Sequence, residues 1–249
     1  MRNYELQKKD FLKFLKLLSD NNLLNTVVVA GSWAEYIYAQ SGLLKGFDGE
    51  LRTLDADFLI KNMRLPREPV SILKLAEDAG YAIKRDTLEE TAKIITRDGL
   101  EIEFLLNQMG SGAHRVLPTN LGIHAQALRH MDISLRNSVT VDLFTMPVTV
   151  PKPEAYTIHK MVINKDRKPG KREKDKDSIY RLAPFLDEEE FKTIYNGLFK
   201  KEQKRVDEFI QEHGPLFEAN KSVEAVLNRA YAKAGDKKQH AGKDDPELG

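Results

Sequence analysis

A short apolar run that passes directly into a glycine, a serine and a helical pattern constrains this chain most. Residues 26–30 (TVVVA) have the composition of a buried strand, and Gly31 and Ser32 follow without a linker. Helical spacing then continues to about Gln40, and Ser32 with Glu35 three residues later has the form of a capping box. The start of such a helix presents free backbone N–H groups and a dipole that favours anions. We therefore expect a phosphate-binding turn at Gly31 and Ser32.

Two acids stand inside the next apolar segment, residues 54–60 (LDADFLI). In a strand, residues two apart point to the same side, so Asp55 and Asp57 should share one face. At a separation of about 5 Å and an effective dielectric of about 20, their repulsion is roughly 3 kcal/mol, which calls for a compensating cation. Mg²⁺ in proteins takes one or two carboxylates together with substrate phosphates. The segment therefore predicts a metal site, although an isolated acid pair more often faces water.

A second acid pair follows a hairpin signal. Strands are expected at 91–96 and 100–106, joined by a turn at Asp98-Gly99. Glu101 and Glu103 share one face of the second strand (LEIEFLL). If the two acidic strands are neighbours in the sheet, a third carboxylate becomes available to the same cation.

The remaining elements predict an α/β domain followed by a helical one. Over residues 1–150 we expect helices at 4–18, 70–79 and 124–131, and further strands at 56–60, 81–84, 132–135 and 139–144. From Pro153 onward the pattern is helical, with helices at 153–166, 174–186, 187–213 and 218–235, the third with Asp187 as N-cap. The second domain is thus expected over 151–233, and 234–249 is expected to be a disordered tail.

Bulk composition sets outer limits. With 249 residues, 41% of them hydrophobic, the chain can bury a sizeable core, and its net charge of +1 identifies no partner. No segment has the length and hydrophobicity of a membrane span, and the first twenty residues read as an amphipathic helix with acids, which predicts a cytoplasmic protein. The absence of cysteine excludes disulfides and thiolate metal sites.

Other side chains are weaker candidates. His124 and His130 lie six residues apart, which does not suit a metal-binding pair on a helix. Trp33 and Tyr36 could stack on a base, but aromatic residues at a helix start more often belong to the core. Residues 110–114 (GSGAH) lack the Lys-Ser/Thr of a phosphate-binding P-loop.

The segments AGS, TLDADFLI and LEIEFLL together resemble the signature of the DNA polymerase beta superfamily of nucleotidyltransferases, over residues 25–107. Residues 151–182 are similar to the region that follows in its abortive-infection (AbiEii-like, toxin-type) branch. The resemblance implies an α/β (α+β) core, with a mixed β-sheet flanked by helices, followed by a C-terminal helical bundle. It also implies that Gly31, Ser32, Lys160 and Asp177 bind nucleotide. It assigns catalysis and metal binding to three acids: Asp55, Asp57 and Glu103.

The chain departs from that pattern at three places. The insert between Ser32 and Asp55 is longer than in many members, so the loop 43–52 is expected to bulge out or to form part of the substrate site. The third acid is Glu where Asp is commoner, and Glu101 competes with Glu103, which we prefer because the apolar run after it fits the family strand better. Tyr180 stands where the family often has a second acid after the Lys-Asp pair, which leaves acceptor activation open.

The resemblance implies transfer of a nucleoside monophosphate from an NTP to an acceptor hydroxyl or phosphate, with Mg²⁺ or Mn²⁺. RNA, proteins and small molecules are the acceptors that it offers, and a toxin–antitoxin or phage-defence role with a cognate antitoxin comes with the branch. Residues 160–177 hold eight Lys or Arg against four acids, which would attract phosphates beside an active site. The alternatives are a non-catalytic nucleotide- or protein-binding member, and a structural protein whose acids are merely solvated.

Overall fold

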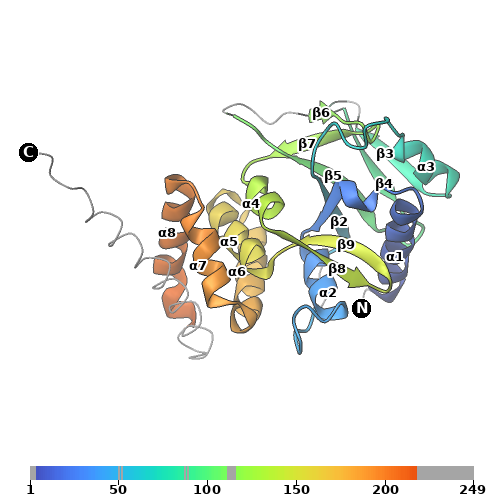
Figure 1. Cartoon of the computed structure of the whole chain (residues 1–249). Helices are drawn as coiled ribbons and strands as arrows, with labels where there is room; N and C mark the ends of the chain where they lie inside the picture. The colour runs from blue at the N-terminus through green and yellow to red at the C-terminus, as the bar shows by residue number, and fades with distance from the viewer. Residues whose placement is uncertain are drawn as a thin grey trace, which may run out of the picture. The chain divides into compact units, whose positions relative to one another are not determined.

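The computed structural model describes residues 4–49, 51, 53–86, 88, 90–110 and 116–217. Two units make up the chain, Met1–Pro151 and Lys152–Gly249. The first is built on a mixed sheet with flanking helices, and the described part of the second is helical. Figure 1 shows the elements of both. Each unit is described on its own below.

A seven-stranded mixed sheet organises the first unit (Figure 1). Its strands are β1 (Val27–Ala30), β2 (Asp55–Ile60), β3 (Ala82–Asp86), β4 (Thr91–Ile95), β5 (Glu101–Asn107), β6 (Val116–Pro118) and β7 (His124–Leu128). The main path runs β1-β2-β5-β4-β3, and β7 pairs with the end of β5 and with β6. The β2/β5 and β5/β7 pairs are parallel, and the other pairs are antiparallel. The carboxyl-bearing strands are therefore direct neighbours.

One face of this sheet is covered by helix α1 (Tyr4–Asp20), close to the predicted span 4–18. Phe11 and Phe14 of α1 are fully buried, and both rings contact Phe58 of β2. Phe14 also meets Phe104 of β5 edge-on. Burying aromatic rings of this size anchors the sheet, because each removes a large apolar area from water. Side chains of β2 alternate between the two faces of the sheet, and Phe58 faces α1. Asp55 and Asp57 therefore lie on the opposite face.

The opposite face is divided between an apolar and an acidic part. Toward the ends of β2 and β5, a cluster of apolar side chains packs beneath helix α4 (Met131–Arg136): Val28, Ala30, Leu59, Leu105 and Met131, with Leu128 and Leu135 against it. Toward the beginnings of the same two strands, the residues on this face are Asp55, Asp57, Glu101 and Glu103. The apolar part packs against α4, and the acidic part carries the predicted metal ligands.

Helix α2 (Ser32–Gln40) has the predicted span, but the predicted capping box is wrong. The N-cap is Gly31, and Ser32 is already the first helical residue, because the chain turns at Gly31 with φ 64° and ψ −159°. The Oγ of Ser32 is buried and makes no hydrogen bond within the described part of the chain. The loop after α2 partly folds back, since Phe47 and Leu51 are buried. Leu43 of the same loop is exposed, so the expectation that the loop bulges out or forms part of the substrate site stays a prediction.

Two predictions beyond β5 are wrong. The span 124–131, expected as a helix, holds β7, in which Ala125 and Ala127 are buried and His124 is exposed, a two-residue period. The span 132–135, expected as a strand, lies in α4, whose Asp132 amide donates to Asn107 Oδ1 at 3.1 Å. Pairing with β5 thus decided both elements, because short apolar runs suit either structure.

The first unit is completed by a hairpin and a short helix. Strands β8 (Ser138–Leu143) and β9 (Met146–Pro151) form a separate two-stranded antiparallel sheet. Their turn is at Phe144 and Thr145, both with positive φ. Helix α3 (Ile72–Asp78) is shorter than predicted because Ser71 caps it by accepting from the Lys74 amide at 3.2 Å.

Four helices form the described part of the second unit: α5 (Pro153–Ile163), α6 (Pro169–Leu182), α7 (Glu188–Asn196) and α8 (Lys200–Phe217). Asp187 caps α7 as predicted, accepting from the Glu190 amide at 2.8 Å. The single helix expected over 187–213 is wrong, because α7 ends at Gly197 and Glu202 accepts from the Phe199 amide at the start of α8. The expected helix at 218–235 and the tail lie outside the described residues.

Three short 3₁₀ turns connect these elements: η1 (Leu24–Thr26), η2 (Asn164–Asp166) and η3 (Ala183–Phe185).

Among the described residues, no helix is long and apolar enough to cross a membrane.

Candidate metal and nucleotide site

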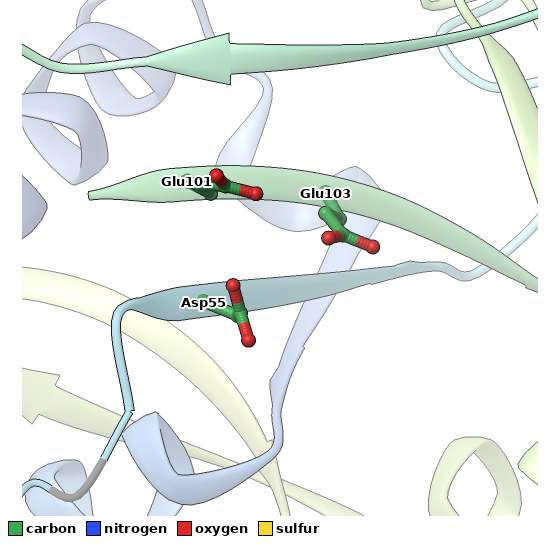
Figure 2. Close-up of side chains that lie close together, drawn as sticks. All are labelled: Asp55, Glu101 and Glu103. Atoms are coloured by element: carbon green, nitrogen blue, oxygen red, sulfur yellow. The ribbon is translucent and has the colours of Figure 1, made fainter. Parts of the chain in front are cut away.

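The register of β2 and β5 brings the predicted acids together. Asp55 lies opposite Glu101 and Asp57 opposite Glu103, and in a parallel pair such partners point to the same face. One carboxylate oxygen each of Asp55, Glu101 and Glu103 lies within 4.8 Å of the other two. Figure 2 shows the three side chains on the two adjacent strands. The condition stated for a third carboxylate, that the two acidic strands are neighbours in the sheet, is therefore met.

Asp57 joins this acidic cluster to the turn before α2. A Cβ placed on Gly31 would lie 2.6 Å from Oδ2 of Asp57, so only a residue without a side chain leaves room for that carboxylate. Asp57 is half-buried, whereas Asp55 is exposed and accepts a hydrogen bond from Thr53 Oγ1 at 3.3 Å. The first helical amides of α2 therefore begin directly beside Asp57. This contact places the acids and the expected phosphate turn in one site.

Lys93 is a component of the site that the sequence analysis missed. Its Nζ lies 2.9 Å from Glu101 Oε2 and also forms an ion pair with Glu103 Oε1. Partial burial would lower the pKa of Lys93, but its hydrogen bonds with Glu103 and Glu101 outweigh this and hold the pKa above its usual value. A hairpin centred on Asp98 places residue 93 opposite residue 103, so the hairpin register could have revealed it.

The donor set suits a hard divalent cation. The clustered groups offer only carboxylate oxygens, the ligands that Mg²⁺ and Mn²⁺ prefer, and they come from two hydrogen-bonded strands that fix their spacing. Lys93 shares its single positive charge between two of these carboxylates, Glu101 and Glu103. Asp55, Glu101 and Glu103 therefore form an acidic triad consistent with a bound divalent metal.

The second unit contains Lys160 and Asp177, the other two predicted nucleotide contacts. Lys160 Nζ lies 2.8 Å from Oδ1 of Asp175 and 4.8 Å from the centre of the Tyr156 ring. Arg167 Nε reaches Oδ2 of the same Asp175, at 3.2 Å. Asp177 is more exposed and lies 3.7 Å from Arg181 Nε. Within this unit, Lys160 therefore belongs to a cation pair around Asp175.

The sequence analysis also missed Asp175, the acid that pairs with Lys160 and Arg167, although the helical pattern around it indicates a buried position. Asp175 is almost fully buried, as are Ser178, Ile179 and Leu182 on the same helix. These four positions have the i, i+3, i+4, i+7 spacing of one helical stripe, which separates Asp175 from Asp177 by about half a turn. Reading that stripe would have singled out Asp175 as the buried acid.

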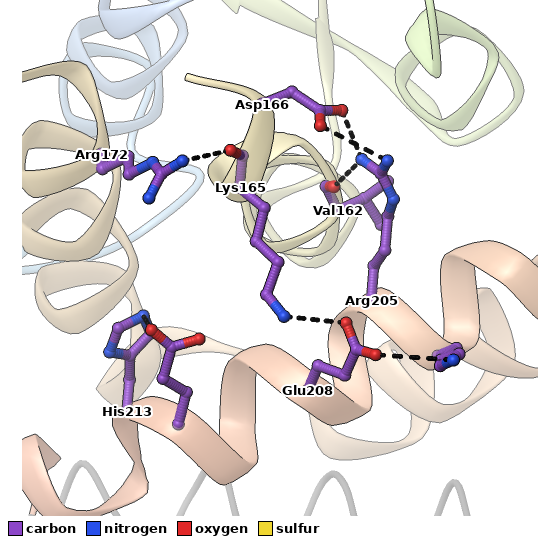
Figure 3. A network of polar contacts seen from close by, with 9 residues as sticks. Val162, Lys165, Asp166, Arg172, Arg205, Glu208 and His213 are labelled. Atoms are coloured by element: carbon purple, nitrogen blue, oxygen red, sulfur yellow. Dashed lines mark hydrogen bonds and ion pairs between the residues drawn. The ribbon is translucent and has the colours of Figure 1, made fainter. Parts of the chain in front are cut away.

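The predicted basic turn between α5 and α6 is largely engaged inside the second unit. Lys165 Nζ lies 2.9 Å from Glu208 Oε2, and Arg205 Nη1 lies 2.5 Å from Asp166 Oδ2. Figure 3 shows both pairs. Arg172 donates to the carbonyl of Lys165. Two other lysines of the turn, Lys168 and Lys171, are exposed.

The weaker candidates stay outside the site. Trp33 is fully buried and stacks on Phe11 with ring centres 4.0 Å apart, which supports the core interpretation. His124 is exposed at the beginning of β7, within 3.2 Å of the Glu90 carbonyl. Most of the glycine loop 110–114 lies outside the described residues.

Comparison with known proteins adds a family match. A family model described as Nucleotidyltransferase matches residues 9–201. No protein with a curated description matches the chain. Among solved structures, an antigenic nucleotidyltransferase-like protein from Paracoccidioides brasiliensis is 14% identical, with a TM-score of 0.48 over 85% of this chain and 89% of that one. The antibiotic-resistance factor ANT(2'')-Ia is 15% identical, with a TM-score of 0.42 over 88% and 98%.

Proposed function

The chain belongs to the nucleotidyltransferase family, and we propose that it transfers a nucleoside monophosphate from an NTP to an acceptor, with release of pyrophosphate. One observation supports this most: the parallel register that sets Asp55 and Asp57 beside Glu101 and Glu103, next to the Gly31 turn. Repulsion between these carboxylates lowers the stability of the folded protein unless a cation compensates it. Family membership and a cluster suited to a metal therefore point to the same reaction class.

Each part of the site has a role in this reaction. Gly31 and Ser32 would receive the nucleotide phosphates on the free amides at the start of α2, a nine-residue helix. Asp55, Asp57 and Glu103 would hold Mg²⁺ or Mn²⁺. When bound, the divalent ion supplies Lewis-acid stabilisation of the charge that develops on the phosphates. These carboxylates would hold that cation beside the phosphate turn, because Asp57 of β2 lies against Gly31 at the start of α2.

A thermal-shift screen tests the proposed function directly. Each of the four NTPs is added with Mg²⁺, with Mn²⁺ or with a chelator, and the unfolding temperature is recorded. A ligand present at one hundred times its Kd stabilises the folded protein by about 2.7 kcal/mol. We expect a rise that requires both metal and at least one NTP. No rise under any of these conditions would favour the structural alternative, in which the acids are only solvated.

Glu103 is expected to matter more for transfer than Glu101. Both glutamates belong to the acidic triad. Glu103 lies opposite Asp57, the acid beside the Gly31 turn, whereas Glu101 lies opposite the exposed Asp55. Glu103→Gln and Glu101→Gln are compared by the rate of pyrophosphate release at saturating metal. We expect at least about a tenfold larger loss for Glu103→Gln, equal to about 1.4 kcal/mol. The reverse order would move the third ligand to Glu101.

Lys160 is proposed as a contact of the triphosphate. Lys160→Ala is expected to raise the NTP concentration needed for half-maximal transfer by about tenfold, since a hydrogen bond to a charged group contributes about 1.5–3 kcal/mol. Arg167→Ala is the matched control, because it removes the other cation that pairs with Asp175. Both variants should lose stability in urea, but only Lys160→Ala should change the NTP requirement. Equal NTP requirements would reduce Lys160 to a structural partner of Asp175.

Several finer points stay predictions. Asp177 as a nucleotide contact, the abortive-infection toxin branch, a cognate antitoxin and a cytoplasmic location all rest on the sequence. The acceptor is RNA, a protein or a small molecule, and the exposed Lys168 and Lys171 favour a polyanion such as RNA. The alternative is a member that binds nucleotide or a partner protein without catalysis. Nucleotide-dependent stabilisation without pyrophosphate release from any NTP would favour that alternative.

A further inference from the structure

Lys93 lies where a metal ion would compete with it. Its ammonium is within 2.9 Å of Glu101 and also pairs with Glu103, two of the three carboxylates of the acidic triad. The lysine comes from β4, which pairs antiparallel with β5, so the hairpin register holds it over the two glutamates. Its side chain is only 36% exposed, so water screens the pair less than it would on an open surface.

Lys93 gives the acidic face a cation that belongs to the chain itself. Four carboxylates on one face of β2 and β5 would repel each other strongly without a counter-charge. The Lys93 ammonium offsets part of that repulsion by pairing with Glu101 and Glu103. A metal that binds Glu103 must take that carboxylate from Lys93, whereas the ammonium can keep its bond to Glu101.

On the premise of the proposed function, we infer that Lys93 is a positioning residue, an exchangeable counter-cation that sets the metal affinity and keeps Glu101 out of the metal shell. Lys93 pairs with both glutamates. It gives up Glu103 and retains Glu101 when the divalent ion binds. Glu101 thereby stays with Lys93, and Glu103 is left to the divalent ion.

The first test measures Mn²⁺ binding in the absence of nucleotide. Binding is monitored by the loss of the electron paramagnetic resonance signal of free Mn²⁺. Lys93→Met removes the competing charge but keeps a flexible apolar side chain of similar length. We expect it to bind Mn²⁺ at least about tenfold more tightly than wild type. Lys93→Arg keeps the charge and should bind as wild type does. Lys84→Met is the matched control, because Lys84 lies opposite Lys93 on β3, is exposed and should leave affinity unchanged.

A double-mutant cycle tests the separate fates of the two glutamates. Glu101→Gln alone should change Mn²⁺ affinity by less than about threefold, because Lys93 already holds that carboxylate. In the Lys93→Met background the same change should remove most of the gained affinity, since Glu101 is then available to the metal. Additive effects would overturn the division of roles between the glutamates.

The unfolding temperature in chelator provides a second readout. Lys93→Met should melt below wild type without metal, because its carboxylates lose their counter-charge, and Mn²⁺ should close the gap. Unchanged or weaker Mn²⁺ binding by Lys93→Met, with wild-type binding intact, would overturn this inference and leave the proposed function standing. Failure of wild type and every variant to bind Mn²⁺ would overturn both. Binding by Lys93→Met alone would support the counter-cation role.

Discussion

Asp57→Asn is expected to abolish nucleotidyl transfer while leaving the fold intact. Asp57 is the acid that both shares the metal face with Glu103 and contacts Gly31. Divalent ions contribute several kcal/mol of charge stabilisation in such reactions, and each 1.4 kcal/mol corresponds to a factor of ten in rate. The rate of pyrophosphate release should therefore fall at least about a hundredfold. In metal-free buffer the variant should be as stable as wild type or more stable, because one like-charge repulsion is gone.

Asp78→Asn, a change of the same chemistry at an exposed position on α3, is the control and should keep the wild-type rate. Urea unfolding with chelator present separates the two effects, since a misfolded Asp57→Asn protein would lose both activity and stability. Wild-type transfer by a folded Asp57→Asn protein would remove Asp57 from the metal site and with it the proposed use of the β2 acids.

Gly31→Ala is expected to damage both stability and activity. Gly31 has φ 64° and ψ −159°, a conformation that is essentially restricted to glycine and that costs other residues about 1–3 kcal/mol. The added Cβ would also lie 2.6 Å from Oδ2 of Asp57, which forces the carboxylate out of its position. We therefore expect a stability loss of about 2 kcal/mol and a loss of activity comparable to that of Asp57→Asn.

Gly42→Ala separates backbone strain from the clash at the site. Gly42 also has a positive φ, of 72°, but a Cβ there would meet nothing within 4 Å. Its alanine variant should lose stability, measured by urea unfolding, but keep its rate of transfer. If Gly31→Ala instead loses stability alone and remains fully active, the contact between Gly31 and Asp57 has no part in positioning the acids.

Local pattern was sufficient for the central elements of the site. The apolar run before Gly31, the helical spacing after it and the alternation around Asp55 and Asp57 each depend on neighbours a few residues apart, so α2 and β2 follow from sequence. The Asp187 cap of α7 could be predicted for the same reason, because a cap is a contact over three residues. The resemblance to a nucleotidyltransferase signature predicted the family, and the family model that matches residues 9–201 confirms it.

Tertiary pairing decided what local pattern left open. The segment at β7 was expected as a helix and is a strand because β5 offers it an unpaired edge, and the helix expected after Asp187 is broken at Gly197.

The sequence by itself determined the residue types of the site: a glycine where only glycine fits, and acids two apart on strands that bury their other face. Which carboxylates meet was decided by the parallel register of β2 and β5, and Lys93 was brought to them by the register of β4. Neither register is written in any short stretch of the chain, because strand pairing joins residues 46 positions apart at Asp55 and Glu101 and depends on which strands find each other in the folded sheet.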